Sequence, residues 1–444
     1  MKKESVLRWA ALACLVVPMF ASYFFDDMFS TVSHLFRHPE TLELGWDSAM
    51  LGDFFGDYSL LCICGGLIIG GVLLDIFGVR VMGSVFIAMM VGGAGLAWYA
   101  LSSGLPSGTA ITLGRIGRMS FGLGSEIAGV AVTRSIAKWF KDGNVSLAMG
   151  LQLAIARLGT GIALIAAPFI VGVPKAWYSL ADTARPALVG MMLLLSGVAV
   201  WALFVWLDAG FDRRRGIVSG RGEVQDEDKF RFKDIFKVLG NPRFLTIGLL
   251  CVTFYCCVSS FKKFGTAVVI PRFGIEAGTA GTMVAMIPFF TIVFTPLFGA
   301  LVDRFGKAGH WMIAGSACVL LGHLVIAFAP QGVPFYGYMG IALLGTGYSL
   351  VPSAMWPSVP KIIPEKNLGT AYSLIYWIQN LGLFFVPKIV GRIFADPSHT
   401  SVLAAVARVE WLFIALASAA ILLACGFTLG PSLRSGGRRG LSHE

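Results

Sequence analysis

The chain has 444 residues, of which 56% are hydrophobic and 14% are charged, and its mean hydropathy is +0.76. A soluble protein of this length would carry a larger charged surface, so the composition excludes a soluble globular enzyme and indicates a membrane protein. The formal net charge of +10 does not predict a nucleic-acid partner. Its cations lie between or beyond apolar runs, as they do in the cytoplasmic loops of membrane proteins.

Apolar segments that are long enough to cross a bilayer recur along the chain. A membrane-spanning helix needs about 20 predominantly apolar residues, and we predict twelve such helices. In chain order they cover residues 6–30, 48–74, 80–101, 108–136, 146–172, 186–208, 243–269, 277–301, 309–329, 333–357, 367–393 and 403–428.

A polar segment divides these helices into two groups of six. It carries a run of arginines and charges of both signs, whereas the other connections are short. We therefore predict an all-α membrane protein in which twelve transmembrane helices form two pseudo-symmetric six-helix bundles. The predicted parts are a first bundle at 1–208, a charged cytoplasmic linker at 209–242, a second bundle at 243–430 and a cytoplasmic tail at 431–444.

The cations also predict the orientation of the chain. Loops on the side of the N-terminus contain most of the lysine and arginine residues, and the opposite loops contain few. Because cytoplasmic loops carry an excess of these cations, we expect both termini to be cytoplasmic. We also expect a plasma or inner membrane and not a lysosomal one, for two reasons. The short segment before the first helix has no dileucine-type sorting signal, and the outer loops have no glycosylation sequon.

The pattern Gly-x3-Asp-x2-Gly, followed by a cation, occurs once in each half of the chain. Both copies lie at the end of an apolar run, which indicates two bundles built on one plan, as in secondary transporters. An aspartate at a helix end can hold a neighbouring helix through an arginine, as Asp75 could with Arg134, or through a helix dipole. The predicted gating or structural residues are Gly71, Asp75, Gly78, Arg80, Arg134, Gly299, Asp303 and Gly306.

Charged residues within the apolar spans are the candidates for substrate binding. A charge inside the bilayer costs at least about 2.5 kcal/mol, so each one needs a partner or a water-filled cavity. Glu126 and Arg157 lie about 15 residues on either side of the loop at Lys141, which at about 1.5 Å per residue gives them similar depth. An acid and a guanidinium at one depth can pair when the site is empty, and they can separate to hold a zwitterion, the acid at its ammonium and the arginine at its carboxylate. The alternative is a buried pair that only joins the two helices.

Further charged and aromatic residues extend this candidate site. Arg118 lies two turns from Glu126 and is either a substrate ligand or a structural arginine bonded to the first helix. Asp27 is its candidate partner or a proton carrier, while Asp26 is expected to face the outer entrance. Aromatic and amide groups come from the tenth and eleventh helices, where simple packing is the alternative. The predicted substrate-binding residues are Glu126, Arg157, Arg118, Asp27, Lys263, Trp356, Tyr376 and Asn380.

Motifs of catalysis and of nucleotide binding are missing from the sequence. Gly306-Lys307 is followed by Ala308 and lacks the earlier glycine of a phosphate-binding loop. No Gly-x-Gly-x2-Gly, His-Glu-x2-His or Gly-x-Ser-x-Gly pattern occurs either. The eight cysteines lie in apolar segments without the spacing of a zinc site. We therefore expect no enzyme activity, cofactor or metal, and a gradient of ions or substrate as the energy source.

The duplicated motif, the twelve predicted helices and Arg118-x3-Gly-x-Gly resemble the major facilitator superfamily over the whole membrane core. Ala156-Arg157-Leu-Gly159, Gly347-Tyr-Ser-Leu-Val and Ala-Met-Trp356-Pro are similar to the branch of that superfamily that contains lysosomal dipeptide transporters. The resemblance implies the major facilitator fold and a dipeptide carrier of the uniport type that works by alternating access. It also implies that Glu126 and Arg157 grip the two peptide termini and that Asp27 is a functional acid.

Two other functions stay open at this point. One is a proton-coupled symporter or antiporter of another metabolite or drug, in which Asp27 or Glu126 takes the proton. The other is a membrane receptor or scaffold that transports nothing, which the charges inside the bilayer and the lack of a sizeable soluble domain disfavour. As partners we expect a small zwitterionic substrate and the lipid bilayer, and no nucleic acid. We expect a monomer without the glycoprotein accessory subunit of the lysosomal members.

Overall fold

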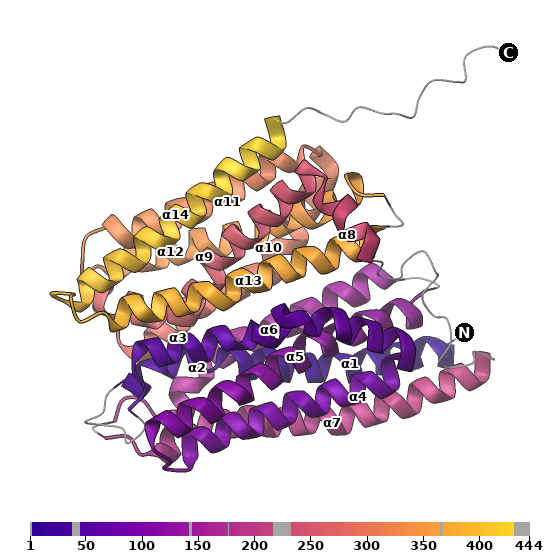
Figure 1. The fold of residues 1–444 in the computed structure, drawn as a ribbon, viewed down its shortest axis with the longest axis horizontal. Helices are drawn as coiled ribbons and strands as arrows, with labels where there is room; N and C mark the ends of the chain where they lie inside the picture. Colours follow the sequence, from indigo (N-terminus) through magenta and orange to yellow (C-terminus); the bar gives the residue numbers. More distant parts are fainter. Residues whose placement is uncertain are drawn as a thin grey trace.

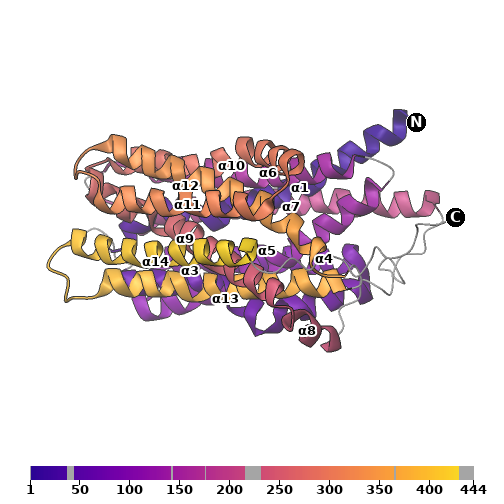
Figure 2. The ribbon, with the colours of Figure 1, turned by 90° about the horizontal axis from the view of Figure 1, so that it is seen from above.

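A computed structural model of the chain describes residues 2–37, 45–141, 144–175, 177–215, 232–364 and 367–429. These residues form helices joined by short turns, and no strand occurs among them. Helices α1–α7 occupy one half of the molecule and α8–α14 the other, with the long helices running along its longest axis (Figure 1). We call the end at which α1 begins and α8 lies the terminal face, and the opposite end, where α2 and α3 lie, the distal face (Figures 1 and 2).

The long helices alternate in direction between these two faces. The helices of the first half, long and short, are α1 (Lys2–Asp27), α2 (Phe29–Val32), α3 (Ser48–Gly56), α4 (Leu67–Ser102), α5 (Ser107–Trp139), α6 (Val145–Val171) and α7 (Leu180–Arg215). Those of the second half are α8 (Phe232–Leu239), α9 (Pro242–Phe273), α10 (Ala277–Phe305), α11 (Ala308–Phe328), α12 (Pro334–Met355), α13 (Leu368–Ala395) and α14 (Val402–Leu429). Irregular helical segments are η1 (Ser33–Arg37), η2 (Asp57–Ser59), η3 (Cys62–Gly66) and η4 (Trp356–Lys361).

All twelve predicted spans fall on helical residues, which confirms the prediction of a helical membrane protein. Within the described ranges, nine helices are long and apolar enough to cross a membrane. One of them, Ser48–Ser102, contains the predicted spans 48–74 and 80–101. The other two spans lie on α5 and α12, which have 33 and 22 residues. α5 is less apolar because it carries several charged residues of the candidate site.

The last glycine of each duplicated motif turns the chain between two spans. Gly78 interrupts α4 with a φ of 77° and a ψ of 165°, and Gly306 follows α10 with a φ of 64°. A positive φ of this size favours glycine because a Cβ atom would crowd the backbone. The first glycines of the two motifs are different, since a Cβ at Gly71 or Gly299 would meet no atom within 4 Å.

Glycine also lets α4 and α5 pack at close range. A Cβ at Gly117 in α5 would lie 2.6 Å from the carbonyl oxygen of Gly93 in α4, and one at Gly93 would lie 2.5 Å from the carbonyl oxygen of Gly117. Small residues bring helix backbones together in this way in membrane proteins. The contact fixes α5, and with it Glu126, against α4.

The helix that follows α3 is irregular where it meets the second half of the molecule. In η3, Cys64 has a ψ of 16° and Gly65 a φ of 98°, so the backbone leaves the helical conformation there. The carbonyl oxygen of Ile63 accepts a hydrogen bond from the indole nitrogen of Trp377 in α13 at 2.9 Å. A broken helix thus supplies a main-chain acceptor that joins the two halves.

The boundary between the predicted first bundle and its linker falls inside a helix. α7 continues to Arg215, beyond the predicted boundary at 208, and α8 lies within the predicted linker 209–242. Asp208 and Asp212 hold this extension through Lys138 at 3.2 and 2.7 Å, and Asp212 also pairs with Arg80 at 2.9 Å. Residues 216–231 of the linker and the tail at 431–444 lie outside the described residues, so the domain boundaries stay predictions.

Candidate substrate-binding site

Two neighbouring cavities that share part of their lining lie between the halves of the molecule. The larger, which we call the vestibule, has a volume of about 600 Å³ and extends toward the terminal face, where Gly150 of α6, Thr295 of α10 and Trp356 line it. The smaller, the chamber, has a volume of about 150 Å³ and extends toward the distal face, where Asp27 and Lys263 line it. The vestibule has the size of typical small-molecule sites. The residues that line both cavities are Tyr23, Glu126, Arg157, Tyr255, Tyr348 and Gln379.

Glu126 lies at the junction of the two cavities. It is part of α5, and its carboxylate accepts a hydrogen bond from the hydroxyl of Tyr58 at 3.1 Å. Tyr58 belongs to η2 in the same half of the molecule. Among the described residues no cation pairs with this carboxylate, so its charge is open to a ligand in the cavity.

Arg157 lies at the same junction and contacts the other half of the molecule. It is part of α6, and its guanidinium donates to the hydroxyl of Tyr348 in α12 at 3.3 Å. The guanidinium also lies over two aromatic rings, 5.9 Å from the centre of Tyr23 and 5.2 Å from that of Tyr348. Such cation–π contacts stabilise a cation without neutralising it.

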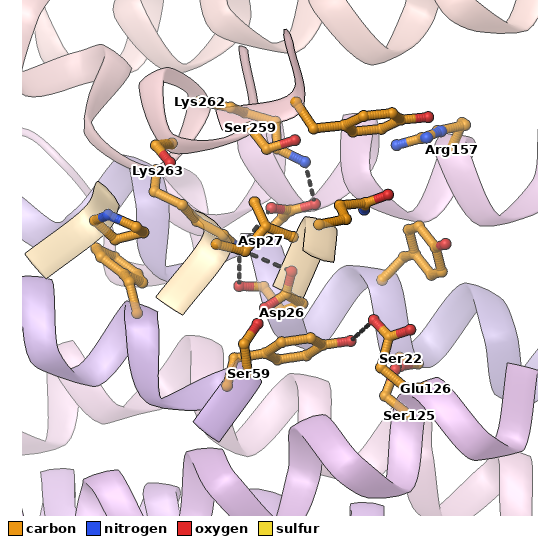
Figure 3. Close-up of a pocket in the computed structure, with 18 of the residues that line it drawn as sticks. Ser22, Asp26, Asp27, Ser59, Ser125, Glu126, Arg157, Ser259, Lys262 and Lys263 are labelled. Atoms are coloured by element: carbon orange, nitrogen blue, oxygen red, sulfur yellow. Dashed lines mark hydrogen bonds and ion pairs between the residues drawn. The ribbon is translucent and has the colours of Figure 1, made fainter. Parts of the chain in front are cut away.

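Of the two arrangements that the sequence allows for Glu126 and Arg157, paired or separate, this conformation has the separate one. The two side chains lie apart in the cavity (Figure 3), and in the described part of the chain no ion pair joins them. Each is instead bonded to a tyrosine hydroxyl, Tyr58 for the acid and Tyr348 for the arginine. Their similar depth follows from the sequence, whereas the rotation of the two helices decides whether they touch.

Ion pairs between the two halves close the chamber at its distal end. Asp27 at the end of α1 bonds to Lys262 and Lys263 of α9, both at 2.8 Å, and Asp26 bonds to Lys263 at 2.8 Å (Figure 3). Asp27 also accepts from the hydroxyl of Thr160 at 2.8 Å. Asp27 and Lys263 therefore line the chamber as members of one cluster.

Arg118 pairs with Asp26, whereas the sequence suggested Asp27 as its candidate partner. Its guanidinium bonds to Asp26 at 2.6 Å and not to Asp27. Arg118 is fully buried and lies over the rings of Phe54 and Tyr58, with its carbon atom 5.1 and 5.4 Å from their centres. It lines neither cavity in this conformation. This geometry fits the structural alternative, an arginine bonded to the first helix.

A second group of ion pairs reinforces the closure of the distal face. Asp57 of η2 is fully buried and bonds to Lys388 of α13 at 2.5 Å and to Arg115 of α5 at 2.5 Å. Asp53 of α3 lies 3.4 Å from Lys388 and 3.6 Å from Arg392. In both groups the acids belong to the first half and the lysines to the second, so the two halves attract each other at this face.

The second half contributes an aromatic wall to the vestibule. Trp356 and Tyr376 stack with their ring centres 5.2 Å apart, and the indole nitrogen of Trp356 donates to the hydroxyl of Tyr255 at 3.3 Å. Both predicted residues therefore line the vestibule. Asn380 is placed differently: it is 1% exposed, it donates to the carbonyl oxygen of Tyr376 at 3.1 Å, and it lines neither cavity.

The two copies of the duplicated motif have different surroundings. Asp75 pairs with Arg134 at 2.5 Å, the contact that the sequence suggested. Asp303 is exposed, and no described residue forms an ion pair with it. The gating roles of these residues and of Arg80 stay predictions.

Several residues at the cavities were not singled out in the sequence. Nothing in the linear pattern separates a tyrosine of a binding site from one that packs against a neighbouring helix. The buried Asp57 lies in a segment whose irregular helical path hydropathy does not reveal. The residues in question are Tyr23, Tyr58, Tyr255 and Tyr348 at the cavities, and Asp57 in the ion pairs of the distal face.

The fold and the site together define a membrane transporter. The profile of the Major Facilitator Superfamily matches residues 15–387, so the chain belongs to this superfamily. Within it, the chain belongs to the branch of the lysosomal dipeptide transporter MFSD1. It is 30% identical to that protein from Mus musculus over 80% of this chain and 72% of the relative. The corresponding values for the protein from Homo sapiens are 30%, 75% and 68%.

Solved structures of other transporters show the same fold. The xylose transporter XylE from E. coli, in a partially occluded inward open conformation, matches with a TM-score of 0.68 at 16% identity over 96% of this chain and 98% of its own. A bacterial homologue of the human drug peptide transporters PepT1 and PepT2 matches with a TM-score of 0.65 at 15% identity over 95% and 97%. The predicted major facilitator fold is therefore confirmed.

Proposed function

We propose that this protein is a carrier of small zwitterions, and specifically of dipeptides, that works by alternating access as a uniporter. The observation that carries the proposal is the arrangement of Glu126 and Arg157. They line the same two cavities, and each is bonded to a tyrosine hydroxyl and not to an opposite charge. The names of the relatives in the MFSD1 branch support the same substrate class.

A dipeptide supplies the two charges that this site lacks. Its ammonium group can donate to the Glu126 carboxylate, and its carboxylate can accept two parallel hydrogen bonds from the Arg157 guanidinium. An uncompensated charge inside the bilayer is costly. A ligand that neutralises both groups at once therefore gains more binding free energy than a ligand that neutralises only one of them. This favours a zwitterion over an organic anion or cation.

The closed distal face supports alternating access. In this conformation the ion pairs of Asp27 and Asp57 hold the two halves together at the distal face, while the vestibule extends toward the terminal face. The excess of cations in the loops of the terminal face predicts that this face is cytoplasmic. Release of substrate to the other side requires the ion pairs to separate and the halves to rock about the site. We place the protein in a plasma or inner membrane as a monomer with cytoplasmic termini.

A thermal-shift screen of the purified protein tests the substrate class. The ligands are alanyl-alanine, its N-acetylated form, its C-terminal amide, free alanine and succinate. We expect alanyl-alanine to raise the melting temperature and both blocked forms to fail, because each has lost one of the charges that the site neutralises. Stabilisation by succinate alone, or equal stabilisation by all three dipeptide forms, would overturn the proposal.

A proton-coupled symporter or antiporter is the second candidate function. It is favoured by one observation: Glu126 has a hydroxyl partner and no cation among the described residues, which is the situation of an acid that can carry a proton through a membrane. Uptake of dipeptide into proteoliposomes with and without an imposed pH gradient separates the two. A uniporter transports in both conditions, whereas a proton-coupled carrier loses concentrative uptake when the gradient is removed.

A further inference from the structure

We propose that the chamber is a subsite for one side chain of the dipeptide and that it selects a short, uncharged side chain that forms hydrogen bonds. The vestibule then receives the other side chain, which can be bulky and apolar. This inference rests on the proposed function, because it requires that Glu126 and Arg157 hold the two termini.

The position of these two residues gives the dipeptide a fixed direction. Glu126 and Arg157 line both cavities and thus stand where the cavities meet. Successive side chains of an extended peptide point to opposite sides of its backbone. A dipeptide held by both termini at this junction therefore directs one side chain toward the distal face and the other toward the terminal face. The two cavities are the spaces that these side chains enter.

The chamber is small and lined by hydroxyl groups. Its volume of about 150 Å³ compares with about 600 Å³ for the vestibule. Ser59 and Ser260 line it and are each 1% exposed, and their hydroxyl oxygens have no hydrogen-bond partner in the described structure. Buried polar groups are normally bonded, and leaving one without a partner costs about 1–3 kcal/mol. A ligand hydroxyl or amide in the chamber would satisfy them.

The ion pairs of the chamber disfavour a charged ligand side chain there. At its distal end, Asp26 and Asp27 are bonded to Lys262 and Lys263 (Figure 3). A charged ligand group would have to break one of these buried ion pairs, and breaking such a pair is strongly unfavourable. A neutral hydroxyl or amide side chain can bond to the serines without disturbing the pairs.

The vestibule has the opposite character. Apart from Glu126 and Arg157, no lining residue carries a charge. Its wall includes the apolar side chains of Leu153 and Ile292 and the stacked rings of Trp356 and Tyr376. A large aromatic or aliphatic side chain gains free energy by leaving water for such a surface.

Dipeptides of inverted sequence test the inference on the unmodified protein. Binding of seryl-phenylalanine, phenylalanyl-serine, phenylalanyl-phenylalanine and alanyl-alanine is measured by isothermal titration calorimetry. We expect one of the two inverted dipeptides to bind about tenfold more tightly than the other and than phenylalanyl-phenylalanine, as expected from one or two lost hydrogen bonds. Equal affinity of the inverted pair, or unimpaired binding of phenylalanyl-phenylalanine, would overturn the subsite while leaving the dipeptide function intact. Failure of alanyl-alanine to bind would overturn the proposed function itself.

A pair of serine variants locates the selectivity in the chamber. Ser260→Val removes a hydroxyl from the chamber, and Ser353→Val makes the same change in the vestibule. We expect Ser260→Val to weaken binding of the preferred serine dipeptide about fivefold or more, because one hydrogen bond is lost. The affinity for alanyl-alanine, which makes no such bond, should change by less than about twofold. Ser353→Val should leave the ratio of these two affinities unchanged. An equal change of the ratio in both variants would contradict the assignment.

Discussion

Asp27, the last residue of α1, accepts a hydrogen bond from Lys262 of α9 at 2.8 Å, and both side chains are buried. The pair joins the two halves of the molecule at the distal end of the chamber. Lys263 bonds to Asp27 and to Asp26 beside it. In this conformation the distal face is closed by charges that must separate before the site can open on that side.

Replacing Asp27 should destabilise the protein. Asp27→Asn leaves Lys262 buried without its acidic partner, and removing one member of a buried ion pair costs about 3–5 kcal/mol. Because Lys262 retains an amide oxygen as acceptor, we expect the lower part of that range. Thermal unfolding of the purified variant measures the effect.

An exposed ion pair supplies the matched control for this variant. Arg408 and Asp396 pair at 3.2 Å with side chains that are 57% and 38% exposed, and exposed pairs contribute at most about 1 kcal/mol. Arg408→Met should therefore change the unfolding temperature little. The double variant Asp27→Asn with Lys262→Met should recover part of the loss, because it removes the stranded charge. Equal shifts of the unfolding temperature for Asp27→Asn and Arg408→Met would show that the buried pair of Asp27 and Lys262 does not stabilise the fold.

Tyr348 should position Arg157 for the substrate carboxylate. Tyr348→Phe removes the hydroxyl that accepts from the guanidinium at 3.3 Å and leaves the ring beneath it. We expect dipeptide affinity to fall about fivefold, the contribution of one hydrogen bond. Tyr372→Phe is the control, since its ring packs on Trp356 with a centre-to-centre distance of 6.0 Å. Unchanged or tighter binding by Tyr348→Phe would show that the hydroxyl does not orient the arginine.

Two glycines of the first motif copy should respond differently to the same substitution. Gly78→Ala places a Cβ on a backbone with a φ of 77° and a ψ of 165°, a conformation almost restricted to glycine, which costs another residue about 1–3 kcal/mol. A Cβ at Gly71 meets no atom within 4 Å, and alanine is favoured over glycine inside a helix, so Gly71→Ala should leave the unfolding temperature unchanged or raise it slightly. Unfolding curves of both variants check this. A larger loss from Gly71→Ala would mean that the space beside it closes in another populated conformation.

The bond between Trp377 and Ile63 should influence the rate of transport. Trp377→Phe removes a hydrogen bond of 2.9 Å that crosses the two halves. Trp311→Phe removes an indole bond to a carbonyl oxygen, that of Gly306 at 3.0 Å, which stays within one half. We expect initial uptake into proteoliposomes to change several-fold for Trp377→Phe only, since about 1 kcal/mol corresponds to about fivefold. Equal uptake rates for the two variants would separate this bond from the conformational change.

The helical organisation could be predicted from the sequence because it depends on local hydropathy. A span must be predominantly apolar along its length, and this property can be read from a stretch of consecutive residues without knowledge of distant contacts. The contact of Asp75 with Arg134 was also predictable, since the motif places an acid at a helix end beside an arginine-bearing helix. It is observed at 2.5 Å.

The partners within the site could not be predicted in the same way. Asp26 and Asp27 are neighbours in the sequence, but successive residues of a helix point about 100° apart. Only the packed structure decides that Arg118 meets Asp26 and that Lys262, 235 positions from its partner, meets Asp27. The tyrosines that bond to Glu126 and Arg157 were missed for the same reason, because their role depends on which helices face each other.

The central claim is that Glu126 and Arg157 each bind one end of a dipeptide. Its most direct test is the affinity of wild-type protein and the Arg157→Ala variant for alanyl-alanine and for its C-terminal amide. In the wild-type protein we expect the free acid to bind at least about tenfold more tightly than the amide, because the arginine contact to a carboxylate contributes about 1.5–3 kcal/mol. In Arg157→Ala this difference should disappear, with binding of the free acid reduced to that of the amide. A preference for the free acid that survives in Arg157→Ala would contradict the claim.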